Sequence, residues 1–327
     1  MMKRREFMTL LGGAALVPLR VSAQEPGRTY RLGFLIPAGR DTPAIAGFLD
    51  ELRLNGFIEG QNLTVIWGDF NVPTNELAER AAALVKAAPD AIVAGPELPL
   101  RTLQAATQTV PLIGMTEDMV ASGLVASLAR PGGNTTGISL LSPELDGKRQ
   151  DILIEAVPGV QRIAALADSN VTPPRHVQTL QEAARAHGVQ LSVFGVGGPE
   201  EIVSAINAAK TSGAEALNFL ATPLFSVPGS RNTRVVIERV TELHLPAIYQ
   251  WPETAEQDGL AAYGPRFVQV YRQRARMVVK VLRGIKPADL PVEQPTSFEL
   301  VINLRSAKAI GREIPTGLVL RADEVIE

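Results

Sequence analysis

Short apolar runs alternate with helix-like segments along almost the whole chain. Apolar runs of this length, without a regular polar position, are typical of strands that are buried on both faces. The runs cover 32–36, 63–67, 91–95, 110–115 and 137–141 in a first set, and 163–167, 191–196, 216–221, 247–250 and 260–263 in a second. The alternation predicts an α/β protein with two parallel, doubly wound sheets, each covered by helices on both faces.

Capping residues mark several of the expected helices. Thr42 and Pro43 combine an N-cap with a proline at the first helical position, and Asn55 followed by Gly56 supplies a stop signal. Residues 267–282 are expected to form a long helix. This spacing of start and stop signals is the one expected between parallel strands.

The two sets of strands predict two lobes that exchange chain segments. The chain is expected to cross between them near residues 141–142, again near 263–265, and a third time along the proline-rich connector 287–295. We expect the N-terminal lobe to hold residues 29–141 and about 264–292, and the C-terminal lobe to hold residues 142–263 and about 293–327. Several crossings predict a stiff multi-strand hinge.

The first residues have the pattern of an export signal. A basic segment with Arg4 and Arg5 precedes an apolar stretch at 9–19, and a small-x-small cleavage pattern ends at Ala23. The apolar stretch is shorter than the ~20 residues of a membrane-spanning helix. Phe7 and the weak hydrophobicity favour the twin-arginine route. We therefore expect residues 1–23 to be a cleaved signal and the protein to be periplasmic.

Composition narrows the classes of function. The chain is 327 residues long, 46% hydrophobic and carries a net charge of −2, so its charge indicates neither nucleic-acid nor membrane-surface binding. It contains no cysteine, which excludes disulfides, thiolate metal sites and a thiol nucleophile. The three histidines are far apart, and no phosphate loop, dinucleotide fingerprint or nucleophile elbow is present. We expect no catalytic residue, cofactor or metal.

Several longer stretches resemble a known family. The stretch Gly123-Leu-Val-Ala-Ser-Leu-Ala-Arg-Pro-Gly-Gly-Asn-Thr-Thr-Gly is one, and the others are 56–62, 143–149, 245–249, 263–265, 286–303 and 321–326. Together they resemble the substrate-binding component of ABC transporters, in the family that includes tryptophan- and tyrosine-binding periplasmic proteins. The resemblance implies a type I periplasmic-binding-protein fold, with two flavodoxin-like domains that close around a ligand.

The candidate site follows from a general rule for open parallel sheets. Ligands bind beyond the carboxyl ends of the strands, where helix N-termini point free N–H groups outward. This rule selects Arg40, Asp41, Thr42, Gly95, Pro96, Glu97, Thr116, Glu117, Asp118 and Ser142 on the first half, and Asp168, Asn170, Thr222, Leu224, Phe225, Tyr249, Trp251 and Tyr263 on the second half or at a crossing.

These side chains suit a zwitterion or a small aromatic acid. Thr42, Ser142 and Thr222, with neighbouring backbone N–H groups, are expected to hold a carboxylate without an arginine, although Thr42 and Ser142 are also expected to cap helices. Three acidic residues are expected to receive an ammonium group, namely Glu97, Asp118 and Asp168. Four aromatic residues are expected to flank the body of the ligand, namely Phe225, Tyr249, Trp251 and Tyr263. Arg40 and Asp41 are expected to contact the ligand from a lid.

The resulting hypothesis is a monomeric solute-binding protein of an ABC importer, with a small-molecule ligand and a permease and ATPase as partners. The expected ligand is an aromatic or branched amino acid, or an aromatic carboxylate. Two alternatives stay open from the sequence: an exported enzyme, because twin-arginine signals accompany folded enzymes, and a sensory module for a receptor kinase.

Overall fold

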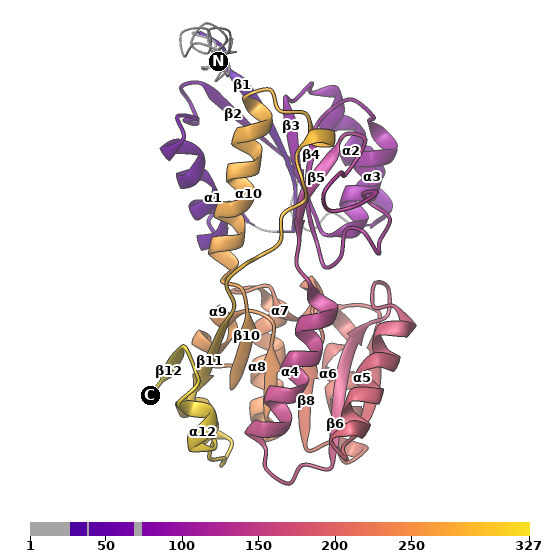
Figure 1. Ribbon diagram of the computed structural model, residues 1–327, viewed down its shortest axis with the longest axis vertical. Helices are drawn as coiled ribbons and strands as arrows, with labels where there is room; N and C mark the ends of the chain where they lie inside the picture. The colour runs from indigo at the N-terminus through magenta and orange to yellow at the C-terminus, as the bar shows by residue number, and fades with distance from the viewer. Residues whose placement is uncertain (1–26, 38, 69–73) are drawn as a thin grey trace, which may run out of the picture.

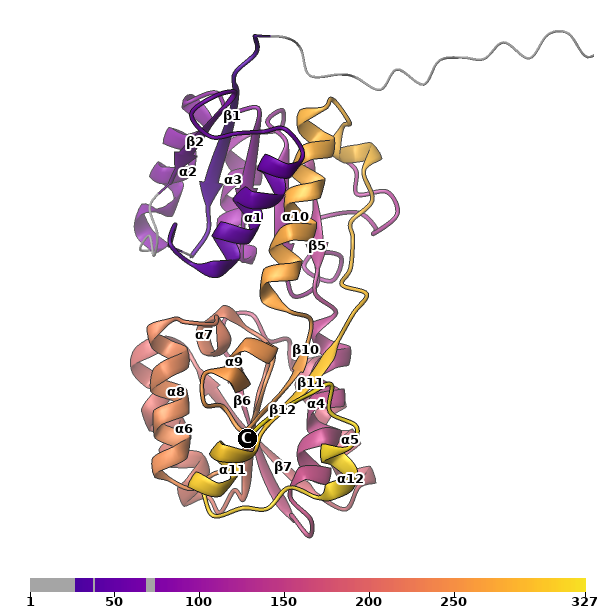
Figure 2. The same ribbon diagram turned by 90° about the vertical axis from the view of Figure 1, so that its left-hand side faces the viewer.

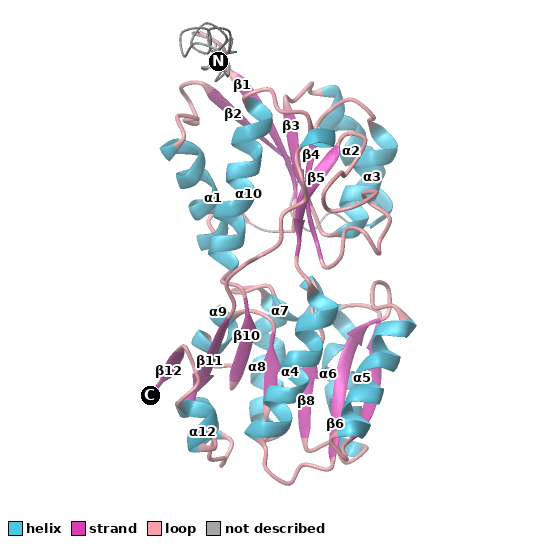
Figure 3. Cartoon of the chain, in the orientation of Figure 1, coloured by secondary structure: helices cyan, strands magenta, loops and turns pink. Residues whose placement is uncertain are grey.

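The computed structural model describes residues 27–37, 39–68 and 74–327. The chain forms two lobes stacked along its long axis, with helices on both sides of a central sheet in each (Figures 1 and 3). The expected export signal, residues 1–23, lies outside the described residues.

The N-terminal lobe is built on a five-stranded parallel sheet. Its strands are β1 (Tyr30–Leu35), β2 (Leu63–Trp67), β3 (Ala91–Ala94), β4 (Leu112–Thr116) and β5 (Thr135–Ser139), in the order β2-β1-β3-β4-β5. Side chains alternate between two cores along β1: Phe34 faces α1 (Pro43–Leu54) and α10 (Phe267–Leu282), whereas Leu35 faces α2 (Leu77–Lys86) and α3 (Glu97–Ala106). The strand order is that of a flavodoxin-like doubly wound sheet.

The C-terminal lobe repeats the same order and extends it. The strands β6 (Arg162–Asp168), β7 (Gln190–Val196), β8 (Ala216–Phe219), β9 (Ala247–Tyr249) and β10 (Ala261–Gly264) run in parallel in the order β7-β6-β8-β9-β10. Next to β10 lie β11 (Glu299–Asn303), which is antiparallel to it, and β12 (Glu324–Ile326).

Two layers of helices cover this second sheet. One core contains residues of α4 (Ser142–Ala156), α5 (Pro174–Ala186), α11 (Leu304–Ala309) and α12 (Thr316–Val319). The other contains residues of α6 (Ile202–Thr211), α7 (Pro223–Ser226), α8 (Arg231–Glu242) and α9 (Pro252–Glu256). Short 3-10 turns are η1 (Thr74–Glu76), η2 (Pro199–Glu201) and η3 (Pro287–Asp289).

Most of the predicted elements are confirmed. Helix α1 begins after Thr42, whose side chain accepts from the Ile45 N–H, and it ends at Asn55; the long helix α10 has the predicted bounds. The predicted runs 110–115 and 137–141 are each displaced, because β4 begins only after Pro111 and β5 already begins at Thr135. The sequence did not predict β12 or the short helices α7, α9, α11 and α12.

The chain crosses between the lobes three times (Figures 1 and 2). It passes from β5 to α4, from β10 to α10, and from η3 back to β11. The third crossing is paired with β5, because the Glu293 N–H donates to the Gly137 carbonyl and the Ser139 N–H donates to the Glu293 carbonyl, both at 2.9 Å. These paired segments form a multi-strand hinge.

Arg266 fastens the second crossing to the C-terminal sheet. Its guanidinium donates to Glu299 at 2.6 Å and also binds Glu256 and Glu324. The network joins the start of α10, the short helix α9 and the last two strands. The start of α10 is therefore held against the C-terminal lobe.

Candidate functional site

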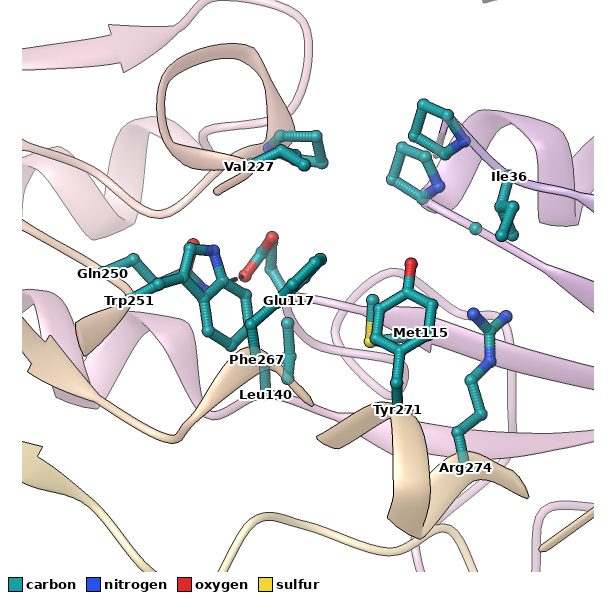
Figure 4. Close-up of a pocket in the computed structure, with 14 residues that line it drawn as sticks. Ile36, Met115, Glu117, Leu140, Val227, Gln250, Trp251, Phe267, Tyr271 and Arg274 are labelled. Atoms are coloured by element: carbon teal, nitrogen blue, oxygen red, sulfur yellow. Dashed lines mark hydrogen bonds between the residues drawn. The ribbon is translucent and has the colours of Figure 1, made fainter. Parts of the chain in front are cut away.

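A small cavity lies between the lobes, beyond the carboxyl ends of the strands (Figure 4). Its volume is about 40 Å³. The N-terminal lobe contributes Ile36, Pro37, Gly95, Pro96, Met115, Glu117, Leu140, Phe267, Tyr271 and Arg274, and the C-terminal lobe contributes Pro223, Val227, Gln250 and Trp251. The loops after β1 and β3 flank the point where the strand order reverses, which is where ligands bind in open α/β sheets.

Aromatic rings form one wall of the cavity. Trp251 follows β9, yet it is buried with the N-terminal core and its ring packs edge-on against Phe267, with 4.7 Å between the ring centroids. The ring of Phe267 in turn lies 4.9 Å from that of Tyr271. Tyr271 and Phe267 are four residues apart on α10 and therefore share a face of the helix. The wall is an apolar surface shared by both lobes.

Glu117 provides a carboxylate at one side of the cavity. The Ser142 hydroxyl donates to its Oε2 atom, and the Gln250 side-chain amide of the opposite lobe lies 3.4 Å from the same oxygen. Burial raises the pKa of the Glu117 carboxyl from 4.5 to about 7, and the negative charge of Asp146 acts in the same direction. The protonated and ionised forms of Glu117 are therefore both populated near neutral pH.

Asp146, one turn after Ser142 on α4, belongs to a buried polar cluster. It forms an ion pair with Arg149, one turn further along α4, and accepts from the Ala221 N–H at 3.1 Å. The side chains of Asp146 and Arg149 are almost fully buried. This cluster fixes the start of α4, and hence Ser142, against the C-terminal sheet.

Arg274 provides a positive charge on the α10 side of the cavity. Its side chain is fully buried, and its Nη2 group donates to the carbonyl oxygens of Ala94 and Ile113, the latter at 2.7 Å. Figure 4 shows Tyr271 and Arg274 rising together from α10, with Tyr271 between Arg274 and Glu117. Among the described residues that line the cavity, Glu117 and Arg274 carry a charge.

A larger groove adjoins the cavity. Its volume is about 940 Å³, and it shares Pro37, Val227 and Phe267 with the lining of the cavity. Ligand pockets for small organic molecules usually measure ~300–1,000 Å³. The cavity alone is thus smaller than an amino-acid site, and the groove gives it a route to solvent.

The structure brings only part of the predicted site together. Gly95, Pro96, Glu117 and Trp251 line the cavity. Ser142 contacts the cavity through its hydrogen bond to Glu117, although it was expected to hold a carboxylate itself.

Thr42, Arg40 and Asp41 lie at the start of α1, away from the cavity lining. Thr42 lines the adjoining groove and caps the helix. Arg40 pairs with Glu59 at 2.7 Å on the surface of the N-terminal lobe, and Asp41 is exposed. The ion pair of Arg40 directs its guanidinium along its own lobe, which differs from the expected contact from a lid.

The acidic residues expected to receive an ammonium group have partners within the protein. Glu97 pairs with Arg101 at 2.7 Å, one turn further along α3. Asp118 accepts from two backbone N–H groups of the turn that follows it, each at 3.0 Å. Asp168 accepts from the Thr222 hydroxyl at 3.0 Å and from the backbone of Asn170 at 2.9 Å. Their carboxylates stabilise a helix and two loops.

Five further residues expected at the site lie within a lobe or at a crossing, and none of them lines the cavity. Phe225 and Tyr249 are fully buried in the C-terminal core, where both rings pack against the same phenylalanine of β8, and the half-buried Leu224 packs against that core. Thr116 is buried at the end of β4. Tyr263 lies on β10 at the second crossing, and its carbonyl accepts from a buried arginine of α4 at 2.9 Å.

The sequence interpretation missed the contribution of α10. Phe267, Tyr271 and Arg274 are spaced four and three residues apart, so they lie on one helical face. The apolar residues of this stripe are indistinguishable from ordinary core positions. The signal that was available is the arginine at a core position, because arginine is rarely fully buried unless it is paired.

Comparison with known proteins assigns the chain to a family. Residues 39–326 match the family described as ABC transporter substrate binding protein. The chain belongs to this family. Its members bind small molecules and work with transporter components outside the cytoplasm. Within the described ranges, no helix is long and apolar enough to cross a membrane.

Individual relatives agree with this assignment. The chain is 26% identical to the tyrosine-binding protein of Clostridioides difficile (strain R20291) over 271 residues. The aligned part covers 81% of this chain and 75% of that protein. A structure from Streptococcus pneumonia in complex with L-Trp has a TM-score of 0.79 and 24% identity, covering 91% of this chain and 100% of the other.

A ligand-free, open substrate-binding protein with adhesive properties from Clostridium difficile has a TM-score of 0.64 and 22% identity, covering 91% of this chain and 99% of that one. These structures have the same fold as this substrate-binding protein: two α/β domains of the type I periplasmic-binding-protein kind.

Proposed function

We propose that this chain is the periplasmic binding subunit of an ABC importer. It captures an aromatic or branched amino acid, or an aromatic carboxylate, between its lobes and delivers it as a monomer to a membrane permease and its ATPase. Export by the twin-arginine route, with cleavage after Ala23, completes the proposal.

The observation that carries the proposal is a cavity lined from both lobes. Glu117, Tyr271 and Arg274 come from the N-terminal lobe, and Gln250 and Trp251 from the C-terminal lobe. A ligand that touches both sets gains its full contacts only when the lobes are closed. Such a ligand therefore shifts the population toward the closed form.

The balance of apolar and polar groups suits a ligand with an aromatic body and a charged head. Burying ~150–200 Å² of apolar ligand surface contributes about 4–5 kcal/mol. A micromolar dissociation constant requires ~8 kcal/mol. The remainder has to come from polar contacts, for which Glu117, Gln250 and Arg274 are in place. The tyrosine-binding relative and the L-Trp complex support the same ligand class.

Thermal unfolding of the mature chain tests the ligand class. We expect L-tyrosine, L-tryptophan, L-phenylalanine, L-leucine or phenylacetate to raise the melting temperature, because a ligand that binds only the folded state stabilises it by mass action. Xylitol, a polyol without a charge or an apolar body, serves as the control. A melting temperature unmoved by every member of the series would refute the ligand class.

The export route has a separate test. Replacing Arg4 and Arg5 by lysine in the full chain keeps the positive charge but removes the arginine pair. We expect the precursor to accumulate in the cytoplasm. Unchanged secretion of the double variant would contradict the twin-arginine route and leave the binding role untouched.

A further inference from the structure

Arg274 carries a buried positive charge that forms no ion pair with any carboxylate in the part of the chain that the structure describes. Its Nη2 group is used by the Ala94 and Ile113 carbonyls. The Nε and Nη1 groups are buried and have no hydrogen-bond partner anywhere in residues 27–37, 39–68 and 74–327. Arginine has five N–H donors, so the two carbonyls leave more than half of the donating capacity unused.

Burial without a counter-charge is unfavourable for the folded protein. It lowers the pKa of Arg274 to about 10, which still leaves the guanidinium positively charged at neutral pH. A buried charge of this kind is usually paired or coordinated. The other charged lining residue, Glu117, is already bound to Ser142 and forms no ion pair with Arg274 across the described part of the cavity.

We propose that Arg274 binds the carboxylate of the ligand and thereby makes α10 the element that selects anionic ligands. This assignment rests on the proposed function, since it names the residue that holds the head group of the captured molecule. It replaces the sequence-based expectation that hydroxyl groups and helix N-termini hold the carboxylate without an arginine.

The surroundings favour a single carboxylate over a phosphate. Arg274 is the cationic residue in the lining of the cavity, and a planar guanidinium matches the geometry of a carboxylate. A doubly charged phosphate would also meet the Glu117 carboxylate across the cavity. A ligand whose carboxylate binds Arg274 would have its aromatic body beside Tyr271, which Figure 4 shows next to Arg274.

Calorimetric titration of the mature protein tests the assignment with matched probes. L-Tyrosine has both head groups, L-tyrosinamide lacks the carboxylate, and 3-(4-hydroxyphenyl)propanoate lacks the amine; the equivalent sets for phenylalanine and tryptophan are included. We expect the wild type to bind each acid about 10- to 100-fold more tightly than its amide, as for a hydrogen bond to a charged group.

The variant Arg274→Gln removes the charge and keeps a donor for the two backbone carbonyls. We expect it to weaken binding of the acids about 10- to 100-fold and to leave binding of the amides within threefold. Arg274→Lys, which restores a charge without the planar fork, is expected to recover part of the affinity. Arg276→Gln is the matched control, because Arg276 lies on the same helix but is about half exposed and pairs with Glu51.

The outcomes separate this assignment from the proposed function. Equal affinity for acid and amide in the wild type, or full affinity for the acids in Arg274→Gln, would overturn the role of Arg274 while the ligand class stands. Binding of 3-(4-hydroxyphenyl)propanoate without the amino acids, lost in Arg274→Gln, would support Arg274 and refute the amino-acid class. If Arg274→Gln does not fold, the acid-to-amide ratio of the wild type and the affinity of Arg274→Lys decide the matter.

Discussion

Replacement of Glu117 by glutamine is predicted to change how stability depends on pH. The variant keeps the shape of a protonated glutamate, and its side-chain oxygen still accepts from the Ser142 hydroxyl. The substitution removes a titratable carboxyl, whose pKa is raised to about 7 by burial. The perturbation therefore isolates the titration of a single group in the cavity.

The sign follows from the number of bound protons. Between about pH 4.5 and 7 the folded protein keeps the Glu117 proton while the unfolded chain has lost it, so the free energy of unfolding falls as the pH rises through this range. One pKa unit corresponds to ~1.4 kcal/mol, which gives about 3 kcal/mol for the full change. Because the side chain is only half-buried, we expect about 2 kcal/mol.

Urea denaturation of the wild type and Glu117→Gln at intervals from pH 4.5 to 8 measures this effect. Other titrating groups contribute equally to both proteins and cancel in the difference. We expect nearly equal stability at pH 4.5, and an advantage of the variant that grows to about 2 kcal/mol at pH 8 and then stays constant. A difference that does not vary with pH, or a wild type that is the more stable at pH 8, would refute the reasoning.

Three further substitutions separate structural from binding roles. Phe225→Ala should lower the free energy of unfolding, measured by urea denaturation, by ~3–5 kcal/mol, as for other buried aromatic residues, and should leave ligand affinity unchanged. A folded variant with weaker ligand binding would show that Phe225 does contribute to the site. Thr42→Ala should cost ~1 kcal/mol through loss of the α1 cap, and a wild-type melting curve would contradict that role. Trp251→Phe should abolish the change of tryptophan fluorescence on binding, because the remaining Trp67 is outside the cavity lining, and a persisting change would argue against an interlobe Trp251.

The fold was largely predictable because its signals are local. The cap at Thr42, the stop at Asn55 and the uninterrupted pattern of 267–282 placed α1 and α10 correctly. The short strand β12 was not predicted, because Glu324–Ile326 is only three residues long and begins with a charged residue. In the structure this strand pairs with β11. Such an element depends on tertiary contacts that no window of sequence contains.

The site was predictable at the level of loops and not of side chains. The strand-end rule selected four residues that line the cavity, namely Gly95, Pro96, Glu117 and Trp251, because strand ends can be predicted from apolar runs. The same rule chose Phe225 and Tyr249, which follow or end strands but point into the core. The rule missed Arg274 because this residue lies in the middle of a helix and not at the end of a strand. Helix α10 contributes to the cavity only because the chain returns to the N-terminal lobe at the second crossing.

The late insertion of α10 has a consequence for any attempt to divide the molecule. The first core joins residues such as Phe34 and Phe48 to Val278 and Leu282, more than two hundred positions downstream. A fragment that ends at the first crossing would expose to water the apolar residues of β1 and α1 that α10 covers. The complementary fragment would contain α10 without the sheet against which it packs. Lobes that fold independently would therefore require three cuts, one at each crossing. The segment with α10 and η3 would be joined directly to the end of β5, and the segment that begins with β11 would be joined to the end of β10.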